Sequence, residues 1–180
     1  MKRSDVGVRE ATEADLDAIV AIYSHHVRTG TASFEIDAPG GAEMARRWRE
    51  LVDRGLPYLV AVAGSGVVGY AYAAPYRPRP AYRFTVEDSV YVRADFARRG
   101  VGATLLAELV SASQRAGARQ MIAVIGDSAN VASIRLHAAA GFTKVGALAS
   151  VGWKFERWLD IVIMEKALGE GNATPPRGRA

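Results

Sequence analysis

The sequence contains no cysteine and no long hydrophobic run. Without cysteine, the 180-residue chain can form neither disulfides nor thiolate metal sites. No apolar stretch approaches the roughly 20 residues that span a bilayer, and the first residues lack the apolar core of a signal peptide. We therefore expect a cytoplasmic protein with no bound metal and no membrane partner.

What is present suits one globular domain. The chain is 49% hydrophobic and 23% charged, which is enough apolar material for a packed core. No internal repeat is visible, and residues 169–180 are rich in glycine and proline without any apolar period. We expect a single domain over residues 1–168, followed by a disordered tail.

The positive charge is concentrated in one stretch. The whole chain has a net charge of +4, whereas residues 77–100 contain six arginines against three acidic residues, a local excess of +3. Such a compact cluster, interrupted by glycines and prolines, favours a pocket for a small anion over a surface that follows a duplex. We expect no nucleic-acid partner. The pI of 9.6 taken alone suggests a nucleic-acid-binding protein. Such a protein would have a DNA affinity that falls steeply with salt concentration.

Hydrophobic periodicity predicts both strands and helices. The expected strands are 6–10, two runs within 56–74, 85–92, 119–126, 146–153 and 155–168, and the expected helices are 12–30, 41–53, 101–116 and a short one within 127–142. Thr12 and Asp15 have the spacing of a capping box at the first helix. This order predicts an α/β protein of the α+β type, with a mixed sheet of six to seven strands and about four flanking helices.

The stretch ARRGVGATLL (97–106) opens a helix through a glycine-rich turn. Gly100 and Gly102 allow close approach of the backbone, so the amides of the turn can point at one phosphate, and Arg98 and Arg99 add positive charge. An ordinary strand-to-helix turn with solvated arginines explains the same pattern. The third glycine of a dinucleotide-binding motif and the lysine of a P-loop are both absent.

This turn resembles the signature of the GNAT N-acetyltransferases, Gln/Arg-x-x-Gly-x-Gly/Ala at the start of a helix that follows a strand. Ala97 departs from that signature, which has glutamine or arginine there. Longer stretches, such as AVIGDSANVASIRLHAAAGF (123–142) and VGWKFERWLD (151–160), are similar to the branch that acetylates phosphinothricin and methionine sulfoximine. The resemblance implies the GNAT fold, acetyl-CoA as donor, a small amino-acid analogue as acceptor, and a homodimer.

The resemblance also implies which residues bind acetyl-CoA. The strand before the turn would pair its backbone with the pantetheine arm, and the turn would hold the pyrophosphate. The cofactor-binding residues implied in this way are Val90, Tyr91, Val92, Arg98, Arg99, Gly100, Val101, Gly102, Ala103, Asn130 and Ser133. Asn130 has a second explanation, because asparagine also caps the N-termini of helices, and Ser128 could do the same.

Glu87 matches the family's general base. Acetyl transfer requires an amine that has lost its proton, and relay of that proton through a water to Glu87 is expected. The alternative is a structural ion pair between Glu87 and Arg77 or Arg83. Strand alternation places Glu87 and Asp88 on opposite faces, and polar groups on both faces at mid-strand are unusual.

His137 is the second candidate catalytic residue. It shares a helix face with Asn130 and Ser133, and we expect it to share the base role or to orient the water. A solvated helix histidine is the alternative. His25 and His26 have no partners at metal-ligand spacing, and we interpret both as structural.

The loop between the strands expected near residues 75 and 85 is predicted to bind the acceptor. Arg77 and Arg83 can each form two hydrogen bonds with a carboxylate or phosphinate, although prolines beside arginines also make solvated turns. The other acceptor-binding residues expected are Tyr76 and Tyr82 as walls, Phe34 and Glu35 as a lid, and Lys154, which a neighbouring subunit could supply.

Together these features predict an N-acetyltransferase that moves acetyl from acetyl-CoA to the α-amine of a small amino-acid analogue by direct attack. Two alternatives remain open. The scaffold could acetylate a different amine, such as a polyamine, an aminoglycoside or a protein N-terminus. It could also be a catalytically silent acetyl-CoA-binding regulator, in which Glu87 has only a structural role.

Overall fold

The computed structural model describes residues 6–64 and 66–176, and its elements follow the predicted order. The strands are β1 (Val6–Glu10), β2 (Tyr58–Ala63), β3 (Gly66–Pro75), β4 (Thr85–Val92), β5 (Gln120–Gly126), β6 (Thr143–Lys154) and β7 (Arg157–Ala167). The helices are α1 (Leu16–Thr29), α2 (Gly41–Asp53), α3 (Val101–Arg115) and α4 (Val131–Ala139), with short 3-10 turns at Glu13–Asp15, Pro80–Tyr82 and Ala94–Phe96. The strand expected from residue 146 begins earlier, at Thr143.

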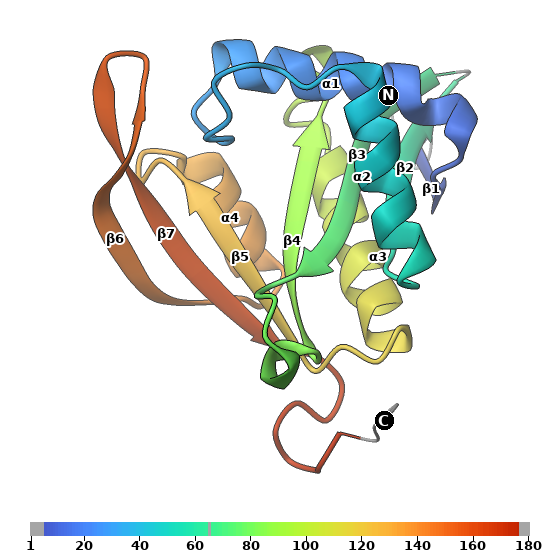
Figure 1. Cartoon of the computed structure of the whole chain (residues 1–180), viewed down its shortest axis with the longest axis vertical. Coiled ribbons are helices and arrows are strands. Elements are labelled where there is room, and N and C mark those ends of the chain that lie inside the picture. The colour runs from blue at the N-terminus through green and yellow to red at the C-terminus, as the bar shows by residue number, and fades with distance from the viewer. Residues whose placement is uncertain (1–5, 65, 177–180) are drawn as a thin grey trace.

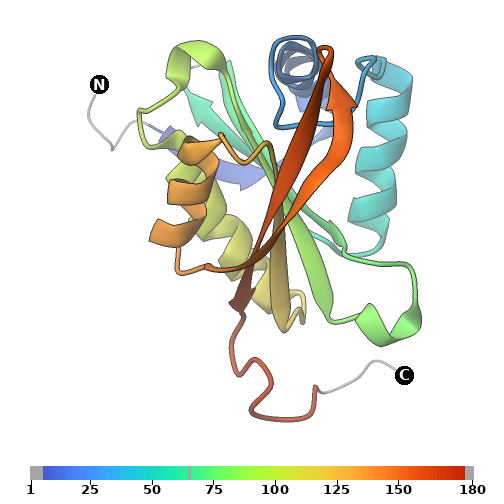
Figure 2. The same cartoon turned by 90° about the vertical axis from the view of Figure 1, so that its left-hand side faces the viewer.

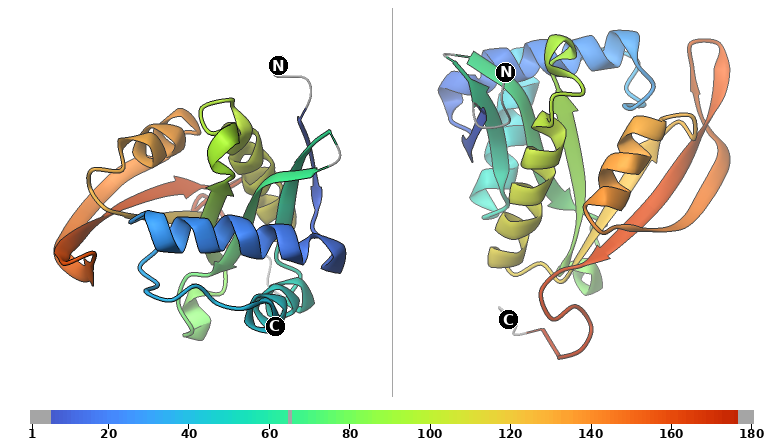
Figure 3. Two further views of the ribbon diagram at one scale, coloured as in Figure 1. Left: turned by 90° about the horizontal axis from the view of Figure 1, so that it is seen from above. Right: turned by 180° about the vertical axis from the view of Figure 1, so that it is seen from behind.

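The seven strands form one mixed sheet in the order β1-β2-β3-β4-β5-β7-β6. Only β4 and β5 pair in parallel, and all other neighbours are antiparallel. Helices α1 and α2 cover one face, while α3 and α4 cover the other (Figures 1 and 2). The view from behind in Figure 3 shows α3 and α4 together in front of the sheet. The predicted mixed sheet with flanking helices is confirmed.

Strands β4 and β5 separate before they end. They pair only through Thr85–Asp88 and Gln120–Ala123, although β4 continues to Val92 and β5 to Gly126. The two strands diverge toward the start of α3 in Figure 1. Backbone groups along the separated halves therefore need partners other than a neighbouring strand.

Each face of the sheet has its own hydrophobic core. On the α3/α4 face, Val86 and Met121 pack with three buried leucines of α3, Leu105, Leu106 and Leu109. On the α1/α2 face, Ile19 and Val27 of α1 pack with Tyr70. Because side chains alternate along a strand, even-numbered residues of β4 point toward α3 and α4, and odd-numbered residues point toward α1 and α2.

Part of the segment after β7, within the expected tail 169–180, contacts the end of the sheet. Arg119, just before β5, donates from Nε to the Gly171 carbonyl at 2.8 Å and from Nη2 to the Thr174 carbonyl at 2.9 Å. These contacts attach the chain to the end of the sheet as far as Thr174. Residues 177–180 lie outside the described residues.

Candidate active site

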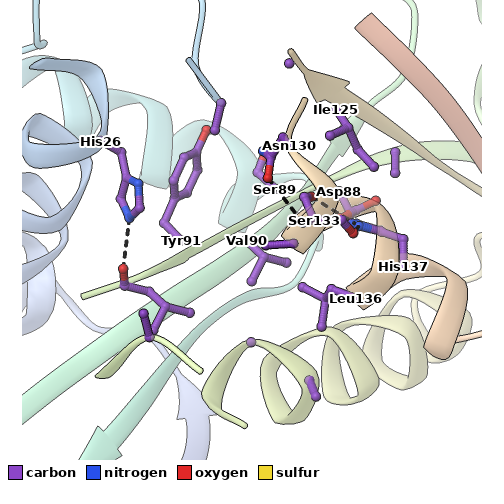
Figure 4. Close-up of a pocket in the computed structure, with 18 of the residues that line it drawn as sticks. His26, Asp88, Ser89, Val90, Tyr91, Ile125, Asn130, Ser133, Leu136 and His137 are labelled. Atoms are coloured by element: carbon purple, nitrogen blue, oxygen red, sulfur yellow. Dashed lines mark hydrogen bonds and ion pairs between the residues drawn. The ribbon is translucent and has the colours of Figure 1, made fainter. Parts of the chain in front are cut away.

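A pocket of about 450 Å³ lies where β4 and β5 separate. It is bounded by both strands, the turn before α3, helix α4 and one residue of α1. Figure 4 shows His26 and Tyr91 on one side of it and Asp88, Ser133 and His137 on the other. The expected cofactor-binding residues that line it are Val90, Tyr91, Val92, Arg98, Gly100, Gly102, Ala103, Asn130 and Ser133.

The open edge of β4 presents backbone groups to this pocket. Arg93 donates its N–H to the Val68 carbonyl, and Tyr76 donates to the Thr85 carbonyl, so odd-numbered residues turn their backbone groups toward β3. Because these groups alternate in direction along a strand, Val90 and Val92 turn theirs toward the pocket. An extended ligand that contains amides can therefore hydrogen-bond to this edge.

The turn before α3 has a conformation suited to close anion contact. Gly100 precedes the helix with φ +86°, a left-handed conformation that glycine adopts without strain. No side chain caps the helix, so the first-turn amides remain available to an external acceptor. The turn packs beside α4, since a Cβ at Gly102 would lie 3.4 Å from the side chain of Leu136, an ordinary contact distance.

Two expected cofactor-binding residues do not line the pocket. The Arg99 guanidinium stacks on Phe96, 5.0 Å from the ring centroid, and Arg93 lies over the same ring at 4.6 Å. Val101 is 1% exposed in the α3/α4 core, so only its backbone can contact a ligand. Ala97, the departure from the family signature, does line the pocket.

Asn130 is the cap of α4. Its Oδ1 accepts a hydrogen bond from the Ser133 N–H at 3.2 Å, as expected for an N-cap. Ser128, the other candidate cap, instead donates to Asp160 Oδ2 at 2.7 Å. Asn130 therefore both starts the helix and faces the pocket.

Asp88 and His137 form a buried pair between β4 and α4. His137 Nε2 lies 2.9 Å from Asp88 Oδ2, and its Nδ1 lies 2.8 Å from the Ser133 carbonyl oxygen. Burial lowers the pKa of His137, but the hydrogen bond and charge of Asp88 outweigh it, so the pKa is raised. With an acceptor at each nitrogen, this geometry favours the doubly protonated ring, which has no lone pair with which to act as a base. The geometry therefore disagrees with a shared base role and with a solvated histidine.

Glu87 lies on the opposite face of β4, and within the described residues its carboxylate has no ion-pair or hydrogen-bond partner. The Arg77 and Arg83 guanidinium groups stack on neighbouring rings instead, so the structural ion pair does not form. Burial, with a smaller contribution from the charge of Asp88, raises the pKa of Glu87, and Arg77 opposes the rise. Ser89, two residues and about 7 Å further along the same face, lines the pocket.

His26 is one of the pocket-lining residues that were not predicted from the sequence. We interpreted both histidines of this pair as structural, and His25 is indeed exposed to solvent. His26 instead lines the pocket, and its Nε2 lies 2.9 Å from the Val92 carbonyl oxygen. No local pattern reveals this contact, because the two residues are 66 positions apart.

The loop residues expected to form acceptor walls lie outside the pocket. The Arg77 guanidinium is 5.0 Å from the ring centroid of Tyr76, that of Arg83 is 4.6 Å from Phe84, and the rings of Tyr76 and Tyr82 meet edge to face at 5.8 Å. This loop adjoins the start of β4, at the opposite end from the turn before α3 (Figure 1). The charge of Arg77 nevertheless reaches Glu87.

Lys154 corrects another expectation. Its ammonium donates to the carbonyls of Gly30 and Ser33 at 2.9 and 2.8 Å in the same chain, and the residue is 3% exposed. Burial lowers its pKa, which the charge of Glu35 partly offsets. Lys154 therefore anchors the segment after α1 through these two carbonyls.

The expected lid residues, Phe34 and Glu35, occupy that same segment. Glu35 Oε1 lies 2.6 Å from Arg47 Nη1. Burial, aided by the charge of Glu35, raises the pKa of Tyr23 to about 12, and the Tyr23 ring meets Tyr91 at a centroid distance of 5.0 Å. Glu35 is thus placed near the α1/α2 side of the pocket.

Gly126 makes room for this segment at the end of β5. An added Cβ would lie 2.6 Å from the Thr31 carbonyl oxygen and 2.9 Å from that of Ala32, and it would press on the ring of Phe34. We expect Gly126→Ala to lower the free energy of unfolding by about 1–3 kcal/mol, measured by urea denaturation. Gly146→Ala is the matched control, because nothing lies within 4 Å of its Cβ position. Equal effects of the two substitutions would contradict the close packing.

Across residues 6–64 and 66–176, no group of acidic or histidine side chains is arranged to hold a metal ion. In the same part of the chain, no helix has both the length and the apolar character needed to cross a bilayer.

Comparison with known proteins agrees with this geometry. The model of the Acetyltransferase (GNAT) family matches residues 19–142. Phosphinothricin N-acetyltransferase of Alcaligenes faecalis is 54% identical over 169 residues, which cover 94% of this chain and 86% of that protein. L-methionine sulfoximine/L-methionine sulfone acetyltransferase of Pseudomonas aeruginosa is 39% identical over 170 residues, or 93% of this chain and 98% of that protein.

A solved structure agrees equally well. The GNAT superfamily phosphinothricin acetyltransferase from Sinorhizobium meliloti, solved in complex with AcCoA, matches with a TM-score of 0.94 at 44% identity. The match covers 98% of this chain and 95% of that one. Fold, pocket and sequence thus lead to one conclusion: the chain belongs to the GNAT family of acetyltransferases.

Proposed function

We propose that this protein transfers an acetyl group from acetyl-CoA to the α-amine of a small amino-acid analogue of the phosphinothricin, methionine sulfoximine or methionine sulfone type. The observation that carries the proposal is the open edge of β4, which begins after Asp88, just beyond Glu87, and leads to the glycine turn at the start of α3. The names of the relatives that match nearly the whole chain support the acceptor class.

The pocket fits acetyl-CoA in chemistry. The uncapped amides around Gly100 and the charge of Arg98 suit a pyrophosphate, and the backbone groups of Val90 and Val92 suit the amides of a pantetheine arm. When bound, acetyl-CoA supplies the acetyl group as a thioester, which a neutral amine can attack. The N–H of Val92 faces the pocket and can donate to an oxygen that gains negative charge.

Glu87 is proposed as the general base. Its carboxylate has no partner among the residues that the structure describes, and its raised pKa brings it closer to the neutral pH at which a base works best. Its distance along the strand from the pocket fits proton relay through a water. His137 is proposed as a doubly protonated partner of Asp88 that fixes α4 against β4, and not as a second base.

Arg77 is proposed to attract the anionic end of the acceptor. It is the arginine whose charge acts on Glu87, so a carboxylate or phosphinate near it would lie on the same side of β4 as the base. Arg83 and Glu35 are proposed to contact the acceptor as well. These contacts require that the loop or the acceptor extend across the space between them and the pocket. An acceptor without an anionic group would gain nothing from these arginines.

An assay of thiol release from acetyl-CoA tests this function. The panel contains phosphinothricin, methionine sulfoximine, methionine sulfone, the standard amino acids, a polyamine and an aminoglycoside. We expect release with the amino-acid analogues above the rate of hydrolysis alone. Release only with the polyamine or the aminoglycoside would favour a different acceptor, and no release with intact acetyl-CoA binding would favour the silent regulator.

We also propose a homodimer formed through the β6/β7 hairpin. Strand β6 is an edge strand, and the hairpin exposes six large apolar side chains, each about half exposed: Val145, Leu148, Val151, Trp153, Phe155 and Trp158. Contiguous apolar surface of this kind marks an interface. Figure 1 shows the hairpin projecting beyond the helices.

Sedimentation tests the dimer. We expect the wild type to sediment as a dimer and Trp158→Lys to shift it toward the monomer, because a buried charge at an interface is costly. Val52→Lys, at an exposed position of α2, is the control and is expected to leave the dimer intact. A monomeric wild type at micromolar concentration would contradict the proposal.

A further inference from the structure

The open edge of β4 offers four backbone groups to the pocket, the N–H and C=O of Val90 and of Val92. In the described part of the chain, one of them has a side-chain partner: the Val92 carbonyl, which lies 2.9 Å from Nε2 of His26 (Figure 4). The partner comes from α1, which otherwise packs on the face of the sheet opposite α3 and α4. A side chain of α1 therefore reaches the edge that the departing β5 leaves open.

The contact fixes the state of the His26 ring. A carbonyl oxygen only accepts hydrogen bonds, so Nε2 must carry the proton. Burial lowers the pKa of His26, which the Val92 carbonyl only partly offsets, so the ring is neutral at physiological pH and Nδ1 is unprotonated. The ring is held in place by Tyr91, whose centroid is 5.5 Å away.

The Val92 carbonyl lies beside the N–H that a ligand would use. If this oxygen had no partner, it would place a negative partial charge in the pocket next to the Val92 N–H. The same peptide is held on its other side by β3, because the Arg93 N–H donates to the Val68 carbonyl, so the carbonyl is the group of this peptide that faces the pocket. A donor from α1 satisfies this oxygen and fixes the peptide from the pocket side as well.

We propose that His26 is a positioning residue of the donor site, which holds the Val92 carbonyl so that the open edge of β4 is ordered before acetyl-CoA binds. The inference rests on the proposed function in one respect, since acetyl-CoA is taken as the ligand of this edge. It assigns no chemistry to His26, whose effect on the reaction passes through the backbone of Val92.

Substitutions of His26 that differ in side-chain length and in hydrogen-bond donor capacity test the proposal. His26→Gln places an amide N–H where Nε2 lies, whereas His26→Asn is one bond too short and His26→Leu has no donor. We expect the Kd for acetyl-CoA, measured by isothermal titration without any acceptor, to rise about three- to tenfold in the Leu and Asn variants and to recover in the Gln variant. His25→Leu, its exposed neighbour on α1, is expected to leave the Kd unchanged.

A second readout follows the hydrogen bond itself. The N–H of Arg93 belongs to the same peptide group as the Val92 carbonyl, so its amide chemical shift in the ligand-free protein should move in the Leu and Asn variants and return in the Gln variant. Kd values within twofold of wild type in both the Leu and the Asn variant would overturn the proposal, as would an unmoved Arg93 signal. Failure of the wild type to acetylate amino-acid analogues would overturn the proposed function alone, because neither readout requires turnover.

Discussion

Replacement of Glu87 by glutamine is expected to lower kcat/KM for the amino-acid acceptor by about a hundredfold to ten-thousandfold, the range that general-base catalysis contributes. Glutamine keeps the shape and the neutral hydrogen-bonding capacity of the side chain but cannot take a proton. The Kd for acetyl-CoA should stay near the wild-type value, because Glu87 lies outside the residues that line the pocket. Steady-state kinetics and titration calorimetry on the same preparation measure both quantities.

Glu165→Gln provides the matched control. Glu165 is exposed on β7 and pairs with Ile122, which in turn pairs with Glu87, so the two glutamates share one row of the sheet. The control should leave kcat/KM unchanged. Retained turnover in Glu87→Gln would remove the catalytic assignment, and equal losses in both variants would point to a general effect of charge.

The pH dependence of kcat/KM provides a second test of the role of Glu87. Burial and Asp88 raise the pKa of Glu87 in the folded protein, so the base becomes protonated at a higher pH than an exposed glutamate would. The acid limb of kcat/KM in the wild type should therefore lie above the usual glutamate value of about 4.3. Glu87→Gln should lose this limb, and an unchanged limb would assign it to another group.

Replacement of His137 by leucine is expected to lower the free energy of unfolding by about 3–5 kcal/mol, the usual cost of removing one member of a buried ion pair. Asp88 Oδ2 would lose its partner, and Asp88 Oδ1 is already buried without one within the described residues. A carboxylate with no partner in this site must either stay charged at high cost or take up a proton. Urea denaturation at neutral pH measures the loss.

The double variant Asp88→Val/His137→Leu should recover most of this loss, because it removes both charges from an apolar setting. His25→Leu, an exposed histidine, serves as the control and should change stability by less than about 0.5 kcal/mol. A double variant less stable than His137→Leu alone would show that the pair is not the source of the cost.

The pair also predicts the direction of the pH dependence. Because the folded-state pKa of His137 is raised, its contribution to stability is fully present below the unfolded pKa of about 6.5. The contribution is lost as the pH rises through the folded value. The difference in stability between wild type and the double variant Asp88→Val/His137→Leu, which has neither titrating group, should therefore shrink on the alkaline side, and a difference that grows there would contradict the charged state of the ring.

The parts of the fold that depend on local signals could be predicted from the sequence. Alternation placed β4 at 85–92, and the structure has it there. The capping box between Thr12 and Asp15 was predicted from spacing alone and is present. Gly100 was predicted to allow a tight turn, and its φ of +86° shows why a residue with a side chain would fit poorly there.

The parts of the fold and of the site that depend on contacts across the sheet could not be predicted from the sequence. The separation of β4 and β5 is set by the register of two strands about 30 residues apart, which no local period encodes. The partner of His137 was visible only as an oddly polar residue, Asp88, on the apolar face of a strand. The contacts of Lys154 could not be predicted for a related reason. Nothing in the sequence distinguishes a lysine that donates to two backbone carbonyls from a lysine that is exposed to solvent.

The transfer itself is tested most directly by following the acetyl group. The protein is incubated with methionine sulfone and acetyl-CoA labelled with carbon-13 at the acetyl carbonyl, and the products are examined by NMR and mass spectrometry. The account predicts one labelled amide on the α-nitrogen of the acceptor for each thiol released. Thiol release without a labelled amide, or no release from a protein that binds acetyl-CoA, would contradict it.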